Sequence, residues 1–168
     1  MPTRRRRALR LAAALAYMGL VGLDRVGIEL VAERVCARFP LVRGRGQALR
    51  VLKFLEEAPR GERTDLQAAL QEVVSRAPRK GLVLLISDGF DESGFRKGLR
   101  FLRYEGFDAN VIRLVDSTEE SPRPLGDLTV VDAETQATVQ LTLTPRLAHK
   151  LATARREMSA RLHQEALR

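Results

Sequence analysis

The sequence has one cysteine and no tryptophan among its 168 residues, and only 5% of them are aromatic. A single cysteine cannot form an internal disulfide, so an apolar core must hold the fold, and a chain of this length can bury one. Because few aromatic residues are available to stack on bases, a surface for single-stranded nucleic acid is not expected. Cys36 lies in a strand-like run, so we expect it to be a small buried hydrophobe rather than a nucleophile.

Long apolar runs are also missing. Residues 11–23 form an apolar stretch that is too short to cross a bilayer as a helix. With the four arginines at residues 4–7, this stretch has the outline of a secretory signal, but no small-residue cleavage site follows it. We therefore expect a buried helix over residues 8–22 and a cytoplasmic protein without a membrane span.

The formal net charge of +8 is unevenly distributed along the chain. Residues 1–60 carry 13 basic and 5 acidic side chains, residues 61–143 carry 10 and 14, and residues 144–168 carry 6 and 2. The acidic middle contains the candidate site, whereas the positive charge lies toward the two ends. Most basic residues are arginines, and no ladder of aromatic residues accompanies them, so no nucleic-acid partner is expected.

One short apolar segment predicts the centre of the fold. Residues 82–87 read LVLLIS and are followed by Asp88 and Gly89. This pattern predicts a strand buried on both faces of a parallel sheet, with Asp88 at the carboxyl end, where open α/β sheets bind ligands. A helix over residues 95–104 and a strand over residues 107–115 follow, in the order of a parallel crossover.

The other expected elements follow from periodicity and from turn residues. Thr64 and Gln67 form the T-x-x-Q pattern of a capping box, and Thr144 with Pro145 opens a final helix. No linker divides the chain, so we expect one α/β domain over residues 1–168. The remaining predicted segments are strands at 25–31, 35–39, 128–131 and 138–143 and helices at 47–58 and 64–77.

A series of short motifs resembles a known family. The motifs are AAALAY at residues 12–17, DRVG at 24–27, TDL at 64–66, LISD at 85–88, Asp116 with Glu119, and DAET at 132–135. In this order, over about residues 8–143, the chain resembles the bacterial domain-of-unknown-function family fifty-eight, which is itself similar to von Willebrand factor A domains.

The resemblance implies a Rossmann-like, doubly wound, mostly parallel sheet with a metal-ion-dependent adhesion site at its carboxyl edge. Thr64 matches the threonine of that site, and Asp88 matches the aspartate of its third loop. The metal implied is Mg2+, which prefers about six oxygen ligands.

The chain departs from the family at the first loop, D-x-S-x-S. Residues 91–93 begin this pattern, but Phe95 stands at the second serine. In the family the loop follows a central first strand, and Met1 lies about where the loop should end. The resemblance therefore implies an N-terminally truncated domain whose sheet lacks its central first strand. Three explanations account for this departure: a start codon placed too far downstream, a true truncation, or a rearranged sheet. We favour the first. We therefore expect Mg2+ to bind poorly or not at all.

The resemblance also implies a function. It indicates a non-enzymatic protein-protein interaction module, working as an adaptor with a MoxR-type AAA+ ATPase. The alternative is a magnesium-dependent phosphohydrolase with Asp88 as nucleophile, although Phe90 stands where such enzymes usually carry a second aspartate. Helix capping by Thr64 and a turn role for Asp88 are the structural alternatives.

Other polar residues give weaker indications. His149 and His163 lack metal-ligand spacing, so we expect surface or capping roles for them. A second acidic site is conceivable, but solvated loops explain its residues equally well: Asp116, Glu119, Asp132 and Glu134.

Overall fold

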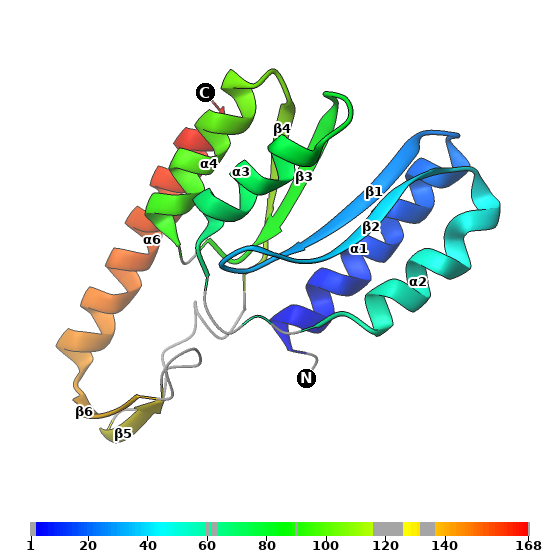
Figure 1. Ribbon diagram of the computed structural model, residues 1–168. Helices are drawn as coiled ribbons and strands as arrows, with labels where there is room; N and C mark the ends of the chain where they lie inside the picture. The colour runs from blue at the N-terminus through cyan, green and yellow to red at the C-terminus, as the bar shows by residue number, and fades with distance from the viewer. Residues whose placement is uncertain are drawn as a thin grey trace. The chain divides into compact units, whose positions relative to one another are not determined.

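The computed structural model has an α/β architecture, which confirms the predicted class (Figure 1). It describes residues 3–59, 61, 64–89, 91–115, 126–131 and 137–167. The chain divides into two compact units, Met1–Leu114 and Val115–Arg168. The strands described form three separate two-stranded sheets, two of them in the first unit.

The first unit begins with a helix and a hairpin. Helix α1 spans Arg4–Val21 and is capped by Thr3, which extends the predicted helix toward the N-terminus. Strands β1 (Arg25–Val31) and β2 (Val35–Arg43) pair antiparallel. The predicted strand at residues 25–31 and its hairpin partner are therefore confirmed, and the partner strand is longer than expected.

A small apolar core holds this hairpin against two helices. A turn of 3-10 helix, η1 (Arg45–Gln47), leads from β2 into helix α2 (Ala48–Glu56). The rings of Phe39 on β2 and Phe54 on α2 lie 5.4 Å apart, in the range of favourable aromatic pairs. The buried residues of this core are Ala16, Leu20, Phe39, Val51 and Leu55.

A parallel crossover completes the first unit. Helix α3 (Leu66–Arg76) leads to strand β3 (Leu82–Ser87), and helix α4 (Glu92–Tyr104) connects β3 to strand β4 (Asp108–Arg113). The two strands pair parallel in one continuous register. The strand at residues 82–87 and the predicted parallel crossover are both confirmed.

The expected burial of β3 on both faces is wrong. Leu85 is 7% exposed, but Leu82 and Leu84 are 61% and 40% exposed. Within the residues described, β3 is bonded to β4 alone and β1 to β2 alone, so these strands form two short sheets in place of one wide sheet. Apolar side chains of β3 therefore lie in solvent, because too few neighbouring elements cover them.

Two further burial predictions are also wrong. Helix α1 buries only the stripe that contains Ala16 and Leu20, whereas Tyr17 and Met18 are exposed on its other side. Cys36 is exposed on the hairpin, where its thiol lies 3.6 Å from the carbonyl oxygen of Arg34. An apolar sequence favours burial, but here no described segment covers these positions.

The second unit contains a hairpin and a long helix. Strands β5 (Gly126–Val131) and β6 (Thr138–Leu143) pair antiparallel, as their sequences predict. Helix α6 (Pro145–Leu167) follows, and the Thr144 hydroxyl accepts the N–H of Leu147 at 3.2 Å, which confirms the predicted cap. No helix in the described part of the chain is both long and apolar enough to cross a membrane.

Candidate functional site

Asp88 lies directly after β3, at the carboxyl end of the strand. The Ser87 hydroxyl accepts the N–H of Gly89 at 3.0 Å, and Gly89 has a φ of 79°, a left-handed conformation that glycine adopts without steric cost. The carbonyl of Asp88 accepts the Nε–H of Arg113, from the end of β4, at 3.3 Å. Local bonds therefore hold the turn that carries the Asp88 carboxylate.

The Asp88 carboxylate is paired with a cation from the first turn of α1. Arg4 Nη1 lies 3.7 Å from Asp88 Oδ2, and the two side chains are 32% and 39% exposed. Such a partly exposed ion pair contributes at most about 1 kcal/mol to stability. The guanidinium nevertheless faces the one carboxylate to which the family resemblance gives a metal-binding role.

Thr64 does not cap α3, which corrects the predicted capping box. The helix begins at Leu66, and its cap is Asp65, whose Oδ1 accepts the N–H of Ala68 at 3.0 Å. Threonine and aspartate are both favourable N-caps, and the helix is capped by the residue that follows the predicted one. Thr64 lies exposed just before the cap, outside the helix.

A residue that the sequence did not single out for capping joins the two loops. Asp91 caps its own helix, α4, because Oδ1 accepts the N–H of Gly94 at 3.0 Å. Its other oxygen, Oδ2, accepts the N–H of Leu66, the first residue of α3, at 3.1 Å. Asp91 thereby ties the loop that carries Asp88 to the loop that carries Thr64.

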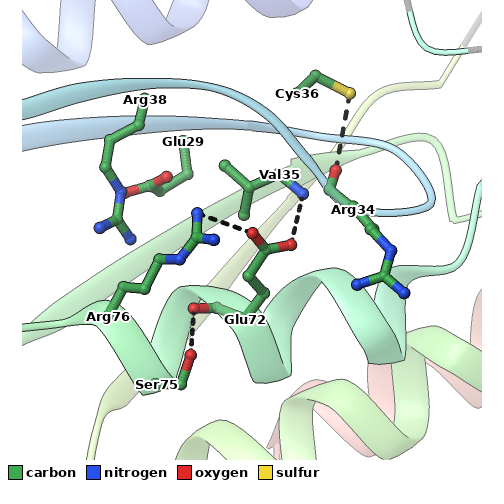
Figure 2. Close-up of polar contacts among 8 residues, drawn as sticks. All are labelled: Glu29, Arg34, Val35, Cys36, Arg38, Glu72, Ser75 and Arg76. Carbon is green, nitrogen blue, oxygen red and sulfur yellow. Dashed lines mark hydrogen bonds and ion pairs between the residues drawn. The ribbon is translucent and has the colours of Figure 1, made fainter.

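The hairpin is held to α3 by a second carboxylate, Glu72 (Figure 2). Its Oε2 accepts the N–H of Val35 at 3.1 Å, and its Oε1 lies 2.8 Å from Nη1 of Arg76. A neighbouring ion pair, Arg38 with Glu29 at 2.6 Å, spans β1 and β2. One oxygen of Glu72 therefore joins α3 to the hairpin, and the other pairs with an arginine of the same helix.

Among the residues that the structure describes, the oxygen donors at this end of β3 are too few for a magnesium site. Mg2+ requires near-octahedral coordination by about six oxygens. The matched residues supply one hydroxyl, from Thr64, and one carboxylate, from Asp88, which faces Arg4. Asp91 has both oxygens engaged by backbone N–H groups. Over the described ranges, no three His, Cys, Asp or Glu side chains gather as metal ligands would.

The sequence profile of the family described as "Protein of unknown function DUF58" matches residues 2–161. The chain belongs to the DUF58 family. The resemblance found in the sequence is thus confirmed at the level of the family.

Two curated relatives of this DUF58 chain are uncharacterized proteins of Mycobacterium tuberculosis and Mycobacterium bovis. Each is 25% identical over 150 residues, which cover 88% of this chain and 47% of the relative. The DUF58 chain therefore spans about half the length of the curated relatives it matches.

Two solved structures resemble the DUF58 chain in fold. One is the conserved hypothetical protein BatB from Bacteroides thetaiotaomicron, with a TM-score of 0.57 and 16% identity over 100% of this chain and 91% of that one. The other is an aerotolerance-related membrane protein from Bacteroides fragilis, with a TM-score of 0.59 and 18% identity over 98% and 90%. At these identities the likeness concerns the fold alone.

The sequence also singled out two histidines and a second acidic site. His149 and His163 both lie exposed on α6, in the second unit. The four residues of the predicted second acidic site, Asp116, Glu119, Asp132 and Glu134, lie outside the described residues.

A shallow apolar groove lies between α1 and α2. Its volume is about 250 Å³, below the range of about 300–1,000 Å³ that is usual for ligand sites. Its lining offers no convergent set of polar groups that would orient a substrate: Ala13, Ala14, Tyr17, Leu20, Ala48, Val51 and Leu52.

Proposed function

We propose that this DUF58 chain is a non-enzymatic protein-protein interaction module that works as an adaptor with a MoxR-type AAA+ ATPase. In this proposal the loops at the carboxyl end of β3 form the docking surface, and their metal-ion-dependent adhesion site is degenerate. Asp88 and Thr64 then contact the partner directly, without a bound metal ion.

The observation that carries this proposal is the way in which the acidic residues of the site are engaged. Arg4 faces the Asp88 carboxylate, and two backbone N–H groups occupy both oxygens of Asp91. A carboxylate held in this way is poorly suited to attack a substrate or to complete a metal shell. It is well suited to fix the shape of a loop surface, which is what recognition of a protein requires.

The arrangement of the first unit supports a von Willebrand factor A-like fold with an interrupted sheet. The unit contains a helix, an antiparallel hairpin and a parallel crossover, with separate sheets for the hairpin and the crossover. In this proposal, the separation marks the place of a central strand that the described residues do not supply. The likeness to BatB at a TM-score of 0.57 is consistent with this fold.

The alternative function, a magnesium-dependent phosphohydrolase, receives less support. A carboxylate nucleophile needs a metal ion to stabilise the charge of the transferred phosphoryl group and a second acidic group to protonate the leaving oxygen. The nearest described carboxylate in the sequence, Asp91, is engaged in capping two helices. A phosphatase screen with the wild-type chain and Asp88→Asn is expected to give no activity in either protein, with or without Mg2+.

A binding measurement with matched charge reversals tests the adaptor proposal. The chain is titrated onto an immobilised MoxR-type ATPase, together with Asp88→Arg and the control Asp108→Arg. Asp108 is an exposed aspartate at the opposite, amino end of β4. We expect binding by the wild-type chain, a loss of at least about tenfold in Asp88→Arg, and no change in Asp108→Arg. Absence of binding, or equal losses in both variants, would overturn the proposal.

A further inference from the structure

Cationic side chains extend the α1 wall of the apolar groove. Ala13, Tyr17 and Leu20 line this wall. Arg6 and Arg10 stand seven and three residues before Ala13, and residues at these spacings lie on one face of a helix. Both arginines are exposed, and neither forms an ion pair with an acidic side chain that the structure describes. The groove therefore continues into a positively charged stripe toward the start of α1.

The other end of the groove also carries a cation. Helices α1 and α2 run side by side in opposite directions, because Arg5, near the start of α1, donates to the carbonyl of Pro59, just after α2 (Figure 1). The turn η1, which leads into α2, therefore lies toward the end of α1, and the turn and the helix are in contact. Arg45 begins this turn and is exposed. Positive charge thus flanks the groove at both ends.

These elements carry little compensating negative charge. Helix α1 contains five arginines and no acidic residue, and η1 adds one more arginine. Helix α2 contains two basic residues and one acidic residue, Glu56. Tyr17 and Leu52, which line the groove, are 47% and 43% exposed. The surface therefore combines an apolar strip with an excess of positive charge, which is the complement of an apolar and acidic partner.

The walls of the groove favour a helix as the occupant. The backbone N–H and C=O groups of α1 and α2 are bonded within their own helices, so neither wall offers partners to an extended segment. A helix satisfies its own backbone and needs only apolar contacts from the groove. The small side chains of Ala13, Ala14 and Ala48 in the walls allow such a helix to approach closely.

We propose that the groove between α1 and α2 binds an amphipathic helix of a partner protein, with apolar side chains on one face and Asp or Glu side chains on its flanks. The apolar face packs between Tyr17 and Leu52, and the acidic flanks meet Arg10 and Arg45. This surface does not include Asp88, so the inference goes beyond the proposed adaptor function and is tested without the ATPase.

Other occupants complement the groove less well. Among the helices that the structure describes, none carries a net negative charge, so a second copy of the chain does not supply an acidic helix. A membrane surface contacts side chains that project from a protein, whereas Leu20 and Val51 lie buried at the floor of this groove. A helix from another protein reaches the floor and also supplies the missing charge.

Peptide binding tests this proposal. Helix α2 has 9 residues, but isolated helices shorter than about 12–15 residues are marginal in water, so the probe is a fluorescent peptide of about 15 residues. It carries leucines at helical spacing and glutamates on both flanks. Its control has the same composition in an order that removes the apolar stripe. We expect the first peptide to bind and the control to bind at least about tenfold more weakly. Equal binding, or no binding of either peptide, would overturn the proposal.

Matched charge reversals locate the site. Arg10→Glu should weaken peptide binding at least about tenfold, whereas Arg96→Glu, the same change at an exposed position of α4, should leave it unchanged. Equal losses in the two variants would mean attraction by net charge alone and would overturn the proposal. Sedimentation without peptide tests self-association, and a dimer that Arg10→Glu dissociates would make a second copy the occupant, against the proposal.

A variant that fills the groove separates a helix from a membrane. Ala14 is an exposed residue of the α1 wall, so Ala14→Trp should block the groove and weaken peptide binding at least about tenfold. If this variant does not fold, Leu52→Asp on the opposite wall should give the same loss. Vesicles of phosphatidylglycerol and phosphatidylcholine are titrated in parallel. Peptide binding that survives the change, or vesicle binding that the tryptophan strengthens, would overturn the assignment to a partner helix.

Discussion

The carboxylate of Asp91 and the backbone N–H of Leu66 form a hydrogen bond of 3.1 Å between residues that are 25 positions apart in the chain. Since the other oxygen of Asp91 accepts the N–H of Gly94, one side chain satisfies the first turns of both α3 and α4. The two helices flank β3 in sequence, so this bond fixes how the chain enters and leaves the strand.

Replacing Asp91 should therefore destabilise the fold more than replacing an ordinary helix cap. We expect Asp91→Ala to lower the free energy of unfolding by about 2 kcal/mol, because one cap contributes about 1 kcal/mol and this carboxylate serves two helices. The control Asp65→Ala removes an exposed cap of α3 alone and should cost about 1 kcal/mol. Urea unfolding followed by circular dichroism measures both, and equal losses would contradict the shared cap.

The two sides of α1 should respond differently to truncation. Leu20 is fully buried against the hairpin, so Leu20→Ala should lower the free energy of unfolding by about 3 kcal/mol through lost contacts and a residual cavity. Met18 is 67% exposed, and Met18→Ala should change stability by less than about 0.5 kcal/mol. Comparable losses in the two unfolding curves would mean that another segment covers the outer side of α1.

The exposure of Cys36 predicts a reactive thiol in the folded chain. We expect the thiol reagent DTNB to modify one thiol per chain in native buffer, without denaturant, because Cys36 lies exposed on the hairpin. The absorbance of the released product measures the reaction, and Cys36→Ser supplies the blank. Modification that requires unfolding would show that the thiol is buried in solution.

Magnesium should not bind measurably at the carboxyl end of β3. Isothermal titration with Mg2+ at millimolar concentration should give only heats of dilution, because one hydroxyl and one carboxylate facing Arg4 fall short of six oxygen ligands. Arg4→Ala should give the same result, since it removes the competing cation without adding a donor. Saturable binding that disappears in Asp88→Asn would refute this expectation.

The elements of the fold could be predicted where their signals are local. The apolar run that became β3 is bounded by Gly81 and Gly89, and the alternation at residues 25–31 marks β1 directly. The position of Asp88 at the end of a strand follows from the same local pattern. These features depend on neighbours within a few residues, which a sequence displays.

Burial could not be predicted in the same way. Leu84 and Met18 belong to apolar segments, and the sequence therefore indicated that both would be covered. Apolar character gives the free energy that a side chain would gain by burial, but another segment must supply the contact. For Leu84 on β3 that segment would be an element packed on the face of the sheet, and among the described residues Leu84 stays 40% exposed.

The contact partners of the site residues could not be predicted from the sequence either. Arg4 precedes Asp88 by more than eighty positions, and Leu66 meets Asp91 across a helix, a turn and a strand. No periodicity or motif specifies such pairs. The capping error between Thr64 and Asp65 has a different cause, because two adjacent residues were both chemically suitable.

The composition of β3 has a consequence for the behaviour of the chain at high concentration. Of the strands that the structure describes, only β4 bonds to it, and its sequence LVLLIS contains neither a charge nor a proline. Association between molecules rises steeply with concentration, whereas folding within one molecule does not, so this strand should limit the concentration at which the chain stays dispersed.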